Sequence, residues 1–246
     1  MLSAQDYFPK NDGVKSKNTN YTALTGAKIF ITPSKSIDNG ILLIKDGHVI
    51  NVGVNIKLPE NTLIINVKGH SIYPSFIDLY ADFGVTKPKR QRSTSRSPHY
   101  SASREGFYWN DHIRPEQNAI DYFKYNHKAA KPLLKAGFGV VNTHLQDGIV
   151  RGTGALVALD SLGSDSQRIL SDQSAQYVSF SKSVRSQQAY PSSIMGVMAL
   201  LRQLNHDADW YANGNVPTKD RSIEAFNRNR NQVQIFEAGS RANALR

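Results

Sequence analysis

Three oxygen-bearing side chains alternate along one short segment of the sequence: Asp78, Tyr80 and Asp82. Side chains two residues apart point to the same face of a β-strand, so these three would gather on one side of a strand here. Their oxygens suit a hard cation such as Mg²⁺ or Ca²⁺. The favoured alternative is structural: the carboxylates anchor loops through hydrogen bonds, and Tyr80 fills space.

His144 is a second candidate, because it follows an apolar segment and precedes Asp147. An imidazole titrates near neutral pH and can act as a metal ligand or a general base. The more common arrangement is a histidine that only hydrogen-bonds its own loop, and both interpretations stand at this stage. Residues 148–154 are glycine-rich and include Arg151, so their N–H groups could cradle a phosphate. They lack a Walker or dinucleotide spacing, and a turn is the favoured interpretation.

Composition excludes several classes of protein. The 246 residues contain no Cys, which rules out disulfides and thiolate chemistry. No apolar run approaches the ~20 residues of a membrane-spanning helix. The net charge of +10 comes from scarce acids rather than abundant bases, so it is weak evidence for nucleic-acid binding. The basic segment 87–104, with Arg90, Arg92 and Arg96, could bind a polyanion, but a solvated loop is favoured because aromatic residues are not interleaved with the charges.

The first part of the chain shows short β-type segments. Residues 1–20 are polar and lack apolar periodicity, which predicts a flexible arm. Four strands are then expected, at residues 27–31, 41–44, 48–52 and 63–67. Asp46-Gly47 between two of them predicts a hairpin, because a tight primed turn needs positive φ. Residues 21–70 are therefore expected to form a small antiparallel β unit.

From residue 71 the pattern alternates between strands and helices. Buried or short strands are expected at residues 71–80, 139–144, 155–159, 176–180 and 232–236. Helices are expected at residues 127–135, 192–204 and 218–227 and from residue 240. Gly137 suits the end of the first helix, and the apolar stripe from Ile194 to Leu204 is predicted to pack in the core. This region therefore belongs to the α/β class.

Four stretches, in this order, resemble the amidohydrolase superfamily, in particular its imidazolonepropionase-like branch and its large bacterial members: residues 39–53, 69–82, 115–156 and 191–196. The first is similar to the family's opening β-sandwich, and the second to its first barrel strand. The resemblance implies a β-sandwich part at residues 21–70, followed at residues 71–246 by the first βα units of an incomplete TIM-type (β/α)8 barrel.

The family hydrolyses C–N bonds with divalent metal such as zinc, held at the carboxyl ends of barrel strands. Its His-x-His pair falls here on Tyr80 and Asp82, and Glu237 stands where a later His is expected. Ser75 replaces a family glycine. A phenol with a pKa near 10 is a poor ligand, and a lone carboxylate does not satisfy a zinc ion that expects imidazoles. The resemblance thus implies a degenerate metal site, no assignable catalytic residue, and no metal held by this chain alone.

Length agrees with an incomplete barrel. The 176 residues from Ser71 to Arg246 fall short of the ~250 of a typical barrel, and only about three barrel strands are recognisable. We therefore expect the N-terminal portion of a longer amidohydrolase-like polypeptide, inactive alone, whose partner is the remaining barrel segment or a second amidohydrolase module. The family implies a small-molecule substrate, and neither a membrane nor nucleic acid is an expected partner.

Two other functions remain open. The chain could be a non-catalytic structural or interaction module that packs on an active amidohydrolase unit, or a basic polyanion binder, so whether it is an enzyme is undecided. Residues 1–5 are too short for a complete signal peptide. If they are the tail of a clipped signal, a periplasmic or secreted protein is expected, and otherwise a cytoplasmic one.

Overall fold

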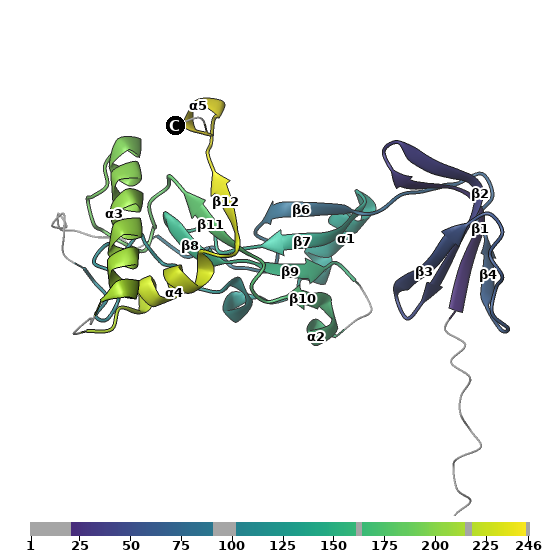
Figure 1. Cartoon of the computed structure of the whole chain (residues 1–246), viewed down its shortest axis with the longest axis horizontal. Helices are drawn as coiled ribbons and strands as arrows, with labels where there is room; N and C mark the ends of the chain where they lie inside the picture. Colours follow the sequence, from purple (N-terminus) through teal and green to yellow (C-terminus); the bar gives the residue numbers. More distant parts are fainter. Residues whose placement is uncertain (1–20, 91–101, 161–163, 215–217, 245–246) are drawn as a thin grey trace, which may run out of the picture. The chain divides into compact units, whose positions relative to one another are not determined.

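The computed structural model describes residues 21–90, 102–160, 164–214 and 218–244 (Figure 1). The expected N-terminal arm at residues 1–20 lies outside these ranges. The chain divides into two compact units, Met1–Pro74 and Ser75–Arg246. None of the described helices is both long and apolar enough to cross a membrane.

The first unit contains one five-stranded sheet. Its strands are β1 (Tyr21–Thr32), β2 (Lys35–Lys45), β3 (His48–Gly53), β4 (Leu63–Asn66) and β5 (Ser71–Ile72). The order is β3-β2-β1-β4, and β5 also pairs with β1. The β2–β3 hairpin is confirmed: Lys45 pairs with His48, and the turn residues Asp46 and Gly47 have φ values of 50° and 78°.

The antiparallel prediction for this unit is only partly right. Strands β1, β2 and β3 are antiparallel, but β4 and β5 both join β1 in parallel, because a long connection after β3 returns the chain to the same end of the sheet. The small core is built on Ala27, Ile29 and Leu42. A second sheet is not seen among residues 21–74, so a β-sandwich stays a prediction.

The second unit contains two sheets. Their strands are β6 (Phe76–Ala81), β7 (Phe138–Thr143), β8 (Val150–Thr153), β9 (Ala155–Ala158), β10 (Ile169–Ser171), β11 (Ala175–Ser179) and β12 (Val233–Glu237). One sheet has the order β10-β9-β7-β6 and the other β12-β11-β8. Strand β6 is parallel to β7, and β11 is parallel to β12. Strands β6 and β12 therefore lie at open ends of their sheets.

The described part of this unit contains six helices, and side chains cap the start of the three longer ones. They are the 3₁₀ helix η2 (Ala119–Tyr122), α1 (His127–Lys135), α2 (Asp165–Arg168), α3 (Ile194–Asn213), α4 (Arg221–Asn229) and α5 (Arg241–Ala244). Asn126 caps α1 by accepting from two backbone N–H groups, and Ser193 caps α3. The predicted core stripe of α3 is confirmed by the burial of Val197 and Leu204. Helices α3 and α4 pack on each other, and α4 contacts β8 (Figure 1).

Two expectations for this unit are wrong. The strand predicted at residues 71–80 is split into β5 and β6, and β6 is not buried: Phe76 is 64% exposed and Leu79 60% exposed. The reason is that β6 pairs only with β7 among the described strands, so nothing covers its other edge. Residues 150–153, within the segment 148–154 predicted as a turn, form strand β8, because they pair with β11. The two sheets do not close into a barrel in the described residues, and the barrel stays a prediction.

Candidate functional site

Polar side chains from four strands meet around one guanidinium group. Tyr80 belongs to β6, His144 follows β7 directly, Arg151 lies in β8, and Glu237 is the last residue of β12. Arg151 Nη1 donates to Tyr80 Oη at 2.8 Å, and Arg151 Nη2 lies 2.7 Å from Glu237 Oε2. Arg151 Nη1 also lies 3.4 Å from His144 Nε2. We call these four residues the arginine cluster.

Arg151 is the buried centre of this cluster. Its side chain is 4% exposed, whereas that of Glu237 is 39% exposed. Its Nε donates to the carbonyl oxygen of Gly148 at 3.1 Å, so all three guanidinium nitrogens face acceptors. A buried cation held in this way is a fixed positive charge at the ends of the strands.

The neighbours of Arg151 titrate away from their ordinary ranges. Burial raises the pKa of the Glu237 carboxyl, but the hydrogen bond from Tyr80 and the charge of Arg151 outweigh it, so the pKa is lowered. The pKa of the Tyr80 hydroxyl is raised, first by burial and then by its hydrogen bond to Glu237, against the effect of Arg151. At neutral pH the cluster therefore holds an ionised glutamate and a neutral tyrosine.

His144 is a buried, neutral imidazole. It is 1% exposed, and its ring stacks on that of Tyr177 with centroids 3.7 Å apart and an interplanar angle of 4°. Burial first, and the charge of Arg151 second, lower its pKa to about 3. Since Nε2 faces the Arg151 donor, the proton of the neutral ring belongs on Nδ1, which has no hydrogen-bond partner among the described residues. An imidazole with so low a pKa is a weak base and stays unprotonated at neutral pH. Its burial and its stacking on Tyr177 favour a packing role.

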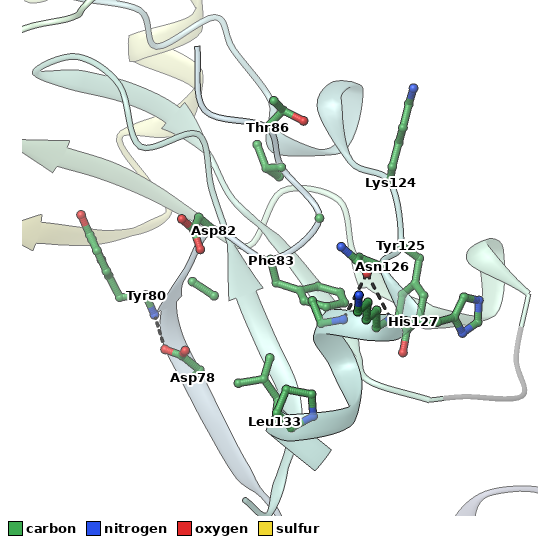
Figure 2. Close-up of a pocket in the computed structure, with 16 residues that line it drawn as sticks. Asp78, Tyr80, Asp82, Phe83, Thr86, Lys124, Tyr125, Asn126, His127 and Leu133 are labelled. Atoms are coloured by element: carbon green, nitrogen blue, oxygen red, sulfur yellow. Dashed lines mark hydrogen bonds between the residues drawn. The ribbon is translucent and has the colours of Figure 1, made fainter. Parts of the chain in front are cut away.

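Asp78 of β6 and Asp82, which directly follows β6, do not join the cluster. Asp78 Oδ1 accepts from the Tyr80 backbone N–H at 3.0 Å, and Asp82 pairs with Lys87 at 3.0 Å. Both line a pocket of about 910 Å³, together with the segment that leads into α1. Figure 2 shows Asp78, Tyr80 and Asp82 on the β6 side of this pocket, and Asn126 and His127 on the α1 side.

The residues present do not fit the metal that the family resemblance implies. Of the three positions that match family ligands, Tyr80 and Glu237 are bonded to Arg151, and Asp82 is paired with Lys87. A guanidinium among the candidate ligands repels a divalent cation. Within the described ranges, no group of three or more His, Asp or Glu side chains could hold a metal ion.

Sequence reasoning missed the pairing of Arg151 with Glu237. It singled out Arg151 only as a phosphate contact and Glu237 only as a replaced histidine. Tyr177 also belongs to this site, since it stacks on His144 and donates to the Leu79 carbonyl at 2.7 Å, and it is not among the predicted site residues. No spacing rule links positions so far apart, and only the pairing of the strands brings them together.

Comparison with known proteins supports the fold. No protein-family model matches the sequence. No curated protein sequence matches it either. Among solved structures, an amidohydrolase from Thermotoga maritima MSB8 superposes with a TM-score of 0.66 at 19% identity, over 91% of this chain and 60% of that chain. The chain thus has a mixed α/β fold related to that of an amidohydrolase, and it spans less than two thirds of that protein's length.

Two other structures overlap too little to carry an argument. One is an uncharacterized protein, with a TM-score of 0.23 at 24% identity over 24% of this chain and 15% of its own. The other is a prolidase complexed with N-methylphosphonate-L-proline, with a TM-score of 0.29 at 15% identity over 50% of this chain and 26% of its own.

Proposed function

We propose that this chain is one portion of an amidohydrolase-like hydrolase that acts on C–N bonds of small molecules, and that it supplies scaffold rather than the metal centre. The fold likeness supports the class of protein. The observation that carries the second part is the position of Arg151, whose guanidinium bonds to Tyr80 and lies beside Glu237, two of the positions that match family metal ligands.

The chemistry of metal-dependent hydrolysis explains why the position of Arg151 argues against a metal centre. Such enzymes lower the pKa of a metal-bound water towards neutrality, which needs a cation with an open coordination position. Arg151 supplies charge but no such position, because a guanidinium donates hydrogen bonds and cannot coordinate water, and its three nitrogens already face Gly148, Tyr80 and Glu237. We therefore expect the described residues of this chain not to activate water by this route.

The open strands β6 and β12 indicate what completes the fold. Large apolar side chains on both are exposed, among them Ile77 (55%), Leu79 (60%), Val233 (67%) and Phe236 (54%). Natural proteins rarely leave such edges uncovered, because they template aggregation. The occupant we propose is the remaining barrel segment, whose strands pair with β6 and β12. A second amidohydrolase module is the alternative occupant.

A non-catalytic module that packs on an active amidohydrolase unit is the second candidate function, and the fully engaged Arg151 favours it equally. The polyanion hypothesis has no comparable support. Of the three arginines on which it rests, Arg92 and Arg96 lie outside the described residues, and Arg90 is at the limit of the described range.

Metal analysis of the purified chain tests the proposal. Elemental analysis by mass spectrometry should find no stoichiometric transition metal after incubation with zinc and desalting, and a panel of amide substrates should not be hydrolysed by the chain alone. Stoichiometric zinc that is lost in Asp82→Ala but kept in Asp38→Ala, an exposed aspartate of the first unit, would show a working metal site and contradict the proposal.

A further inference from the structure

A second group of charged side chains is buried in the loops of the second unit. We call it the loop cluster, and its members are Arg104, Asp111, Arg114, Glu116, Asp147 and Arg185. Asp111 (2% exposed), Asp147 (3%) and Arg114 (7%) are almost fully removed from solvent. Buried charges persist in proteins when they are paired or bind a ligand, so each member needs a partner.

The acids of the loop cluster already have partners. Asp147 Oδ2 accepts from Arg185 Nε and from Ser183 Oγ, both at 2.7 Å. The hydrogen bonds from Ser183, Val184 and Arg185 outweigh burial and lower the pKa of the Asp147 carboxyl. The carboxylate is therefore ionised and fully engaged.

Arg104 engages the other two acids. Its Nη1 pairs with Glu116 Oε1, and its Nε lies 3.6 Å from Asp111 Oδ1. Glu116 Oε2 also accepts from Ser222 Oγ at 2.9 Å, and Asp111 Oδ2 accepts from Ser186 Oγ at 3.2 Å. No carboxylate of the cluster is left over for Arg114.

Arg114 is the member without a counterion. Its Nε donates to the backbone carbonyl of Asp111 at 2.8 Å. Neither of its terminal nitrogens has an acceptor among the described residues, and no carboxylate there lies within ion-pair distance. Burial first, and then the charges of Arg185 and Arg104, lower its pKa to about 10, against the weaker pull of Asp147 and Glu116.

Arg185 presents a further free donor beside it. Arg185 Nε is held by Asp147, and its Nη2 donates to Gln117 Oε1 at 3.0 Å. Its Nη1 has no acceptor within the described ranges. Arg185 is also the charged neighbour that acts most strongly on Arg114. The two arginines are linked through Gln117, whose backbone N–H donates to the Arg114 carbonyl oxygen at 3.3 Å and whose side chain accepts from Arg185. Guanidinium groups with unused planar donors match the oxygens of a carboxylate or a phosphate.

The loop cluster also lies where α/β proteins bind ligands. Asp147 follows β7, which ends at Thr143, and Arg185 follows β11, which ends at Ser179. In open α/β sheets, ligands bind outside the carboxyl ends of the strands. The free donors therefore lie on the side of the strands where ligands bind in such folds, and the side-chain contacts that fix Arg185 orient it in advance.

We propose that Arg114 and Arg185 bind the oxyanion group, carboxylate or phosphate, of a small molecule. This inference goes beyond the proposed function, since it requires neither hydrolysis nor a completed barrel. The bound anion would neutralise the buried guanidinium of Arg114, which has no ion-pair partner among the described residues.

Thermal unfolding of the full chain in matched salts tests the site. We expect sodium phosphate, sodium acetate or both to raise the Tm of the wild type above its value in sodium chloride of equal ionic strength. Arg114→Met should lose this rise, whereas Arg228→Met, which removes an exposed arginine of α4, should keep it. A rise with phosphate alone identifies a phosphate group as the ligand chemistry, and a rise with acetate alone identifies a carboxylate.

A second variant keeps the test informative if Arg114→Met does not fold. Arg114→Lys keeps the charge but loses the planar pair of donors, so titration calorimetry with the effective anion should show about tenfold weaker binding than the wild type. In chloride, Arg114→Met should unfold at the wild-type temperature or higher, because it removes an uncompensated buried charge. The proposal is overturned if neither anion raises the wild-type Tm, or if Arg114→Met or Arg114→Lys responds as the wild type does.

Discussion

Glu237→Ala is expected to destabilise the second unit more than Arg151→Met, although the two residues form one ion pair. Glu237→Ala leaves a guanidinium that is 4% exposed without its counterion, and an unpaired buried charge costs about 3–5 kcal/mol. Arg151→Met leaves a carboxylate whose Oε2 is buried but whose side chain is 39% exposed, so its charge keeps partial access to water. Its cost is the loss of hydrogen bonds to Tyr80 and Gly148, about 1–2 kcal/mol.

Urea unfolding followed by tryptophan fluorescence measures this difference. Both tryptophans, Trp109 and Trp210, belong to the second unit, so the signal reports on the unit that contains the ion pair. Glu105→Ala, at an exposed position of the same unit, is the matched control. The reasoning is refuted if Glu237→Ala costs no more than Glu105→Ala, or if Arg151→Met proves the more costly of the two.

Three further predictions concern other features. The pKa of His144 in the folded state is below that of free histidine, so protonation favours unfolding and the unfolding free energy falls as the pH is lowered, by up to about 1.4 kcal/mol per pH unit. His144→Gln should make this fall less steep between about pH 6.5 and pH 4, as measured by urea titrations, and an unchanged slope would contradict this. Leu79→Lys on the open edge of β6 should reduce self-association in light scattering, unlike Met195→Lys at an equally exposed position of α3, and equal effects would argue against the edge. Gly152→Ala places a new Cβ 1.9 Å from the Gln117 carbonyl oxygen and should lower the unfolding free energy by more than about 3 kcal/mol in chemical denaturation. Gly106→Ala has a similar positive φ but open space around the new Cβ, and should lower it by about 1–2 kcal/mol. Similar losses of unfolding free energy in the two variants would contradict the steric argument.

The features that the sequence predicted correctly are local ones. Asp46-Gly47 specifies a two-residue turn through the φ values that its residues tolerate. The end of α1 before Gly137 and the buried stripe of α3 follow from capping and from helical periodicity. Each of these signals lies within a few residues of the structure that it determines.

The features that the sequence could not predict depend on which strands become neighbours. The apolar pattern of β6 indicated a buried strand, because a pattern reports the preference of a strand and not whether a partner covers it. Arg151 and Glu237 meet only because β8 and β12 flank the same strand, β11. The unpaired state of Arg114 likewise appears only once the partners of every nearby acid are known.

The hydrogen bond of Arg151 to Tyr80 and its ion pair with Glu237 limit how substitutions could create a metal site here. A histidine at position 80 or 82 alone would stand beside a fixed cation, so neither substitution would gain a metal. Losing Arg151 first would remove the donor to Tyr80 and the counterion of Glu237, and would lower stability before any metal could bind. A metal site at these positions therefore requires more than one substitution, and the loss of Arg151 has to be among them.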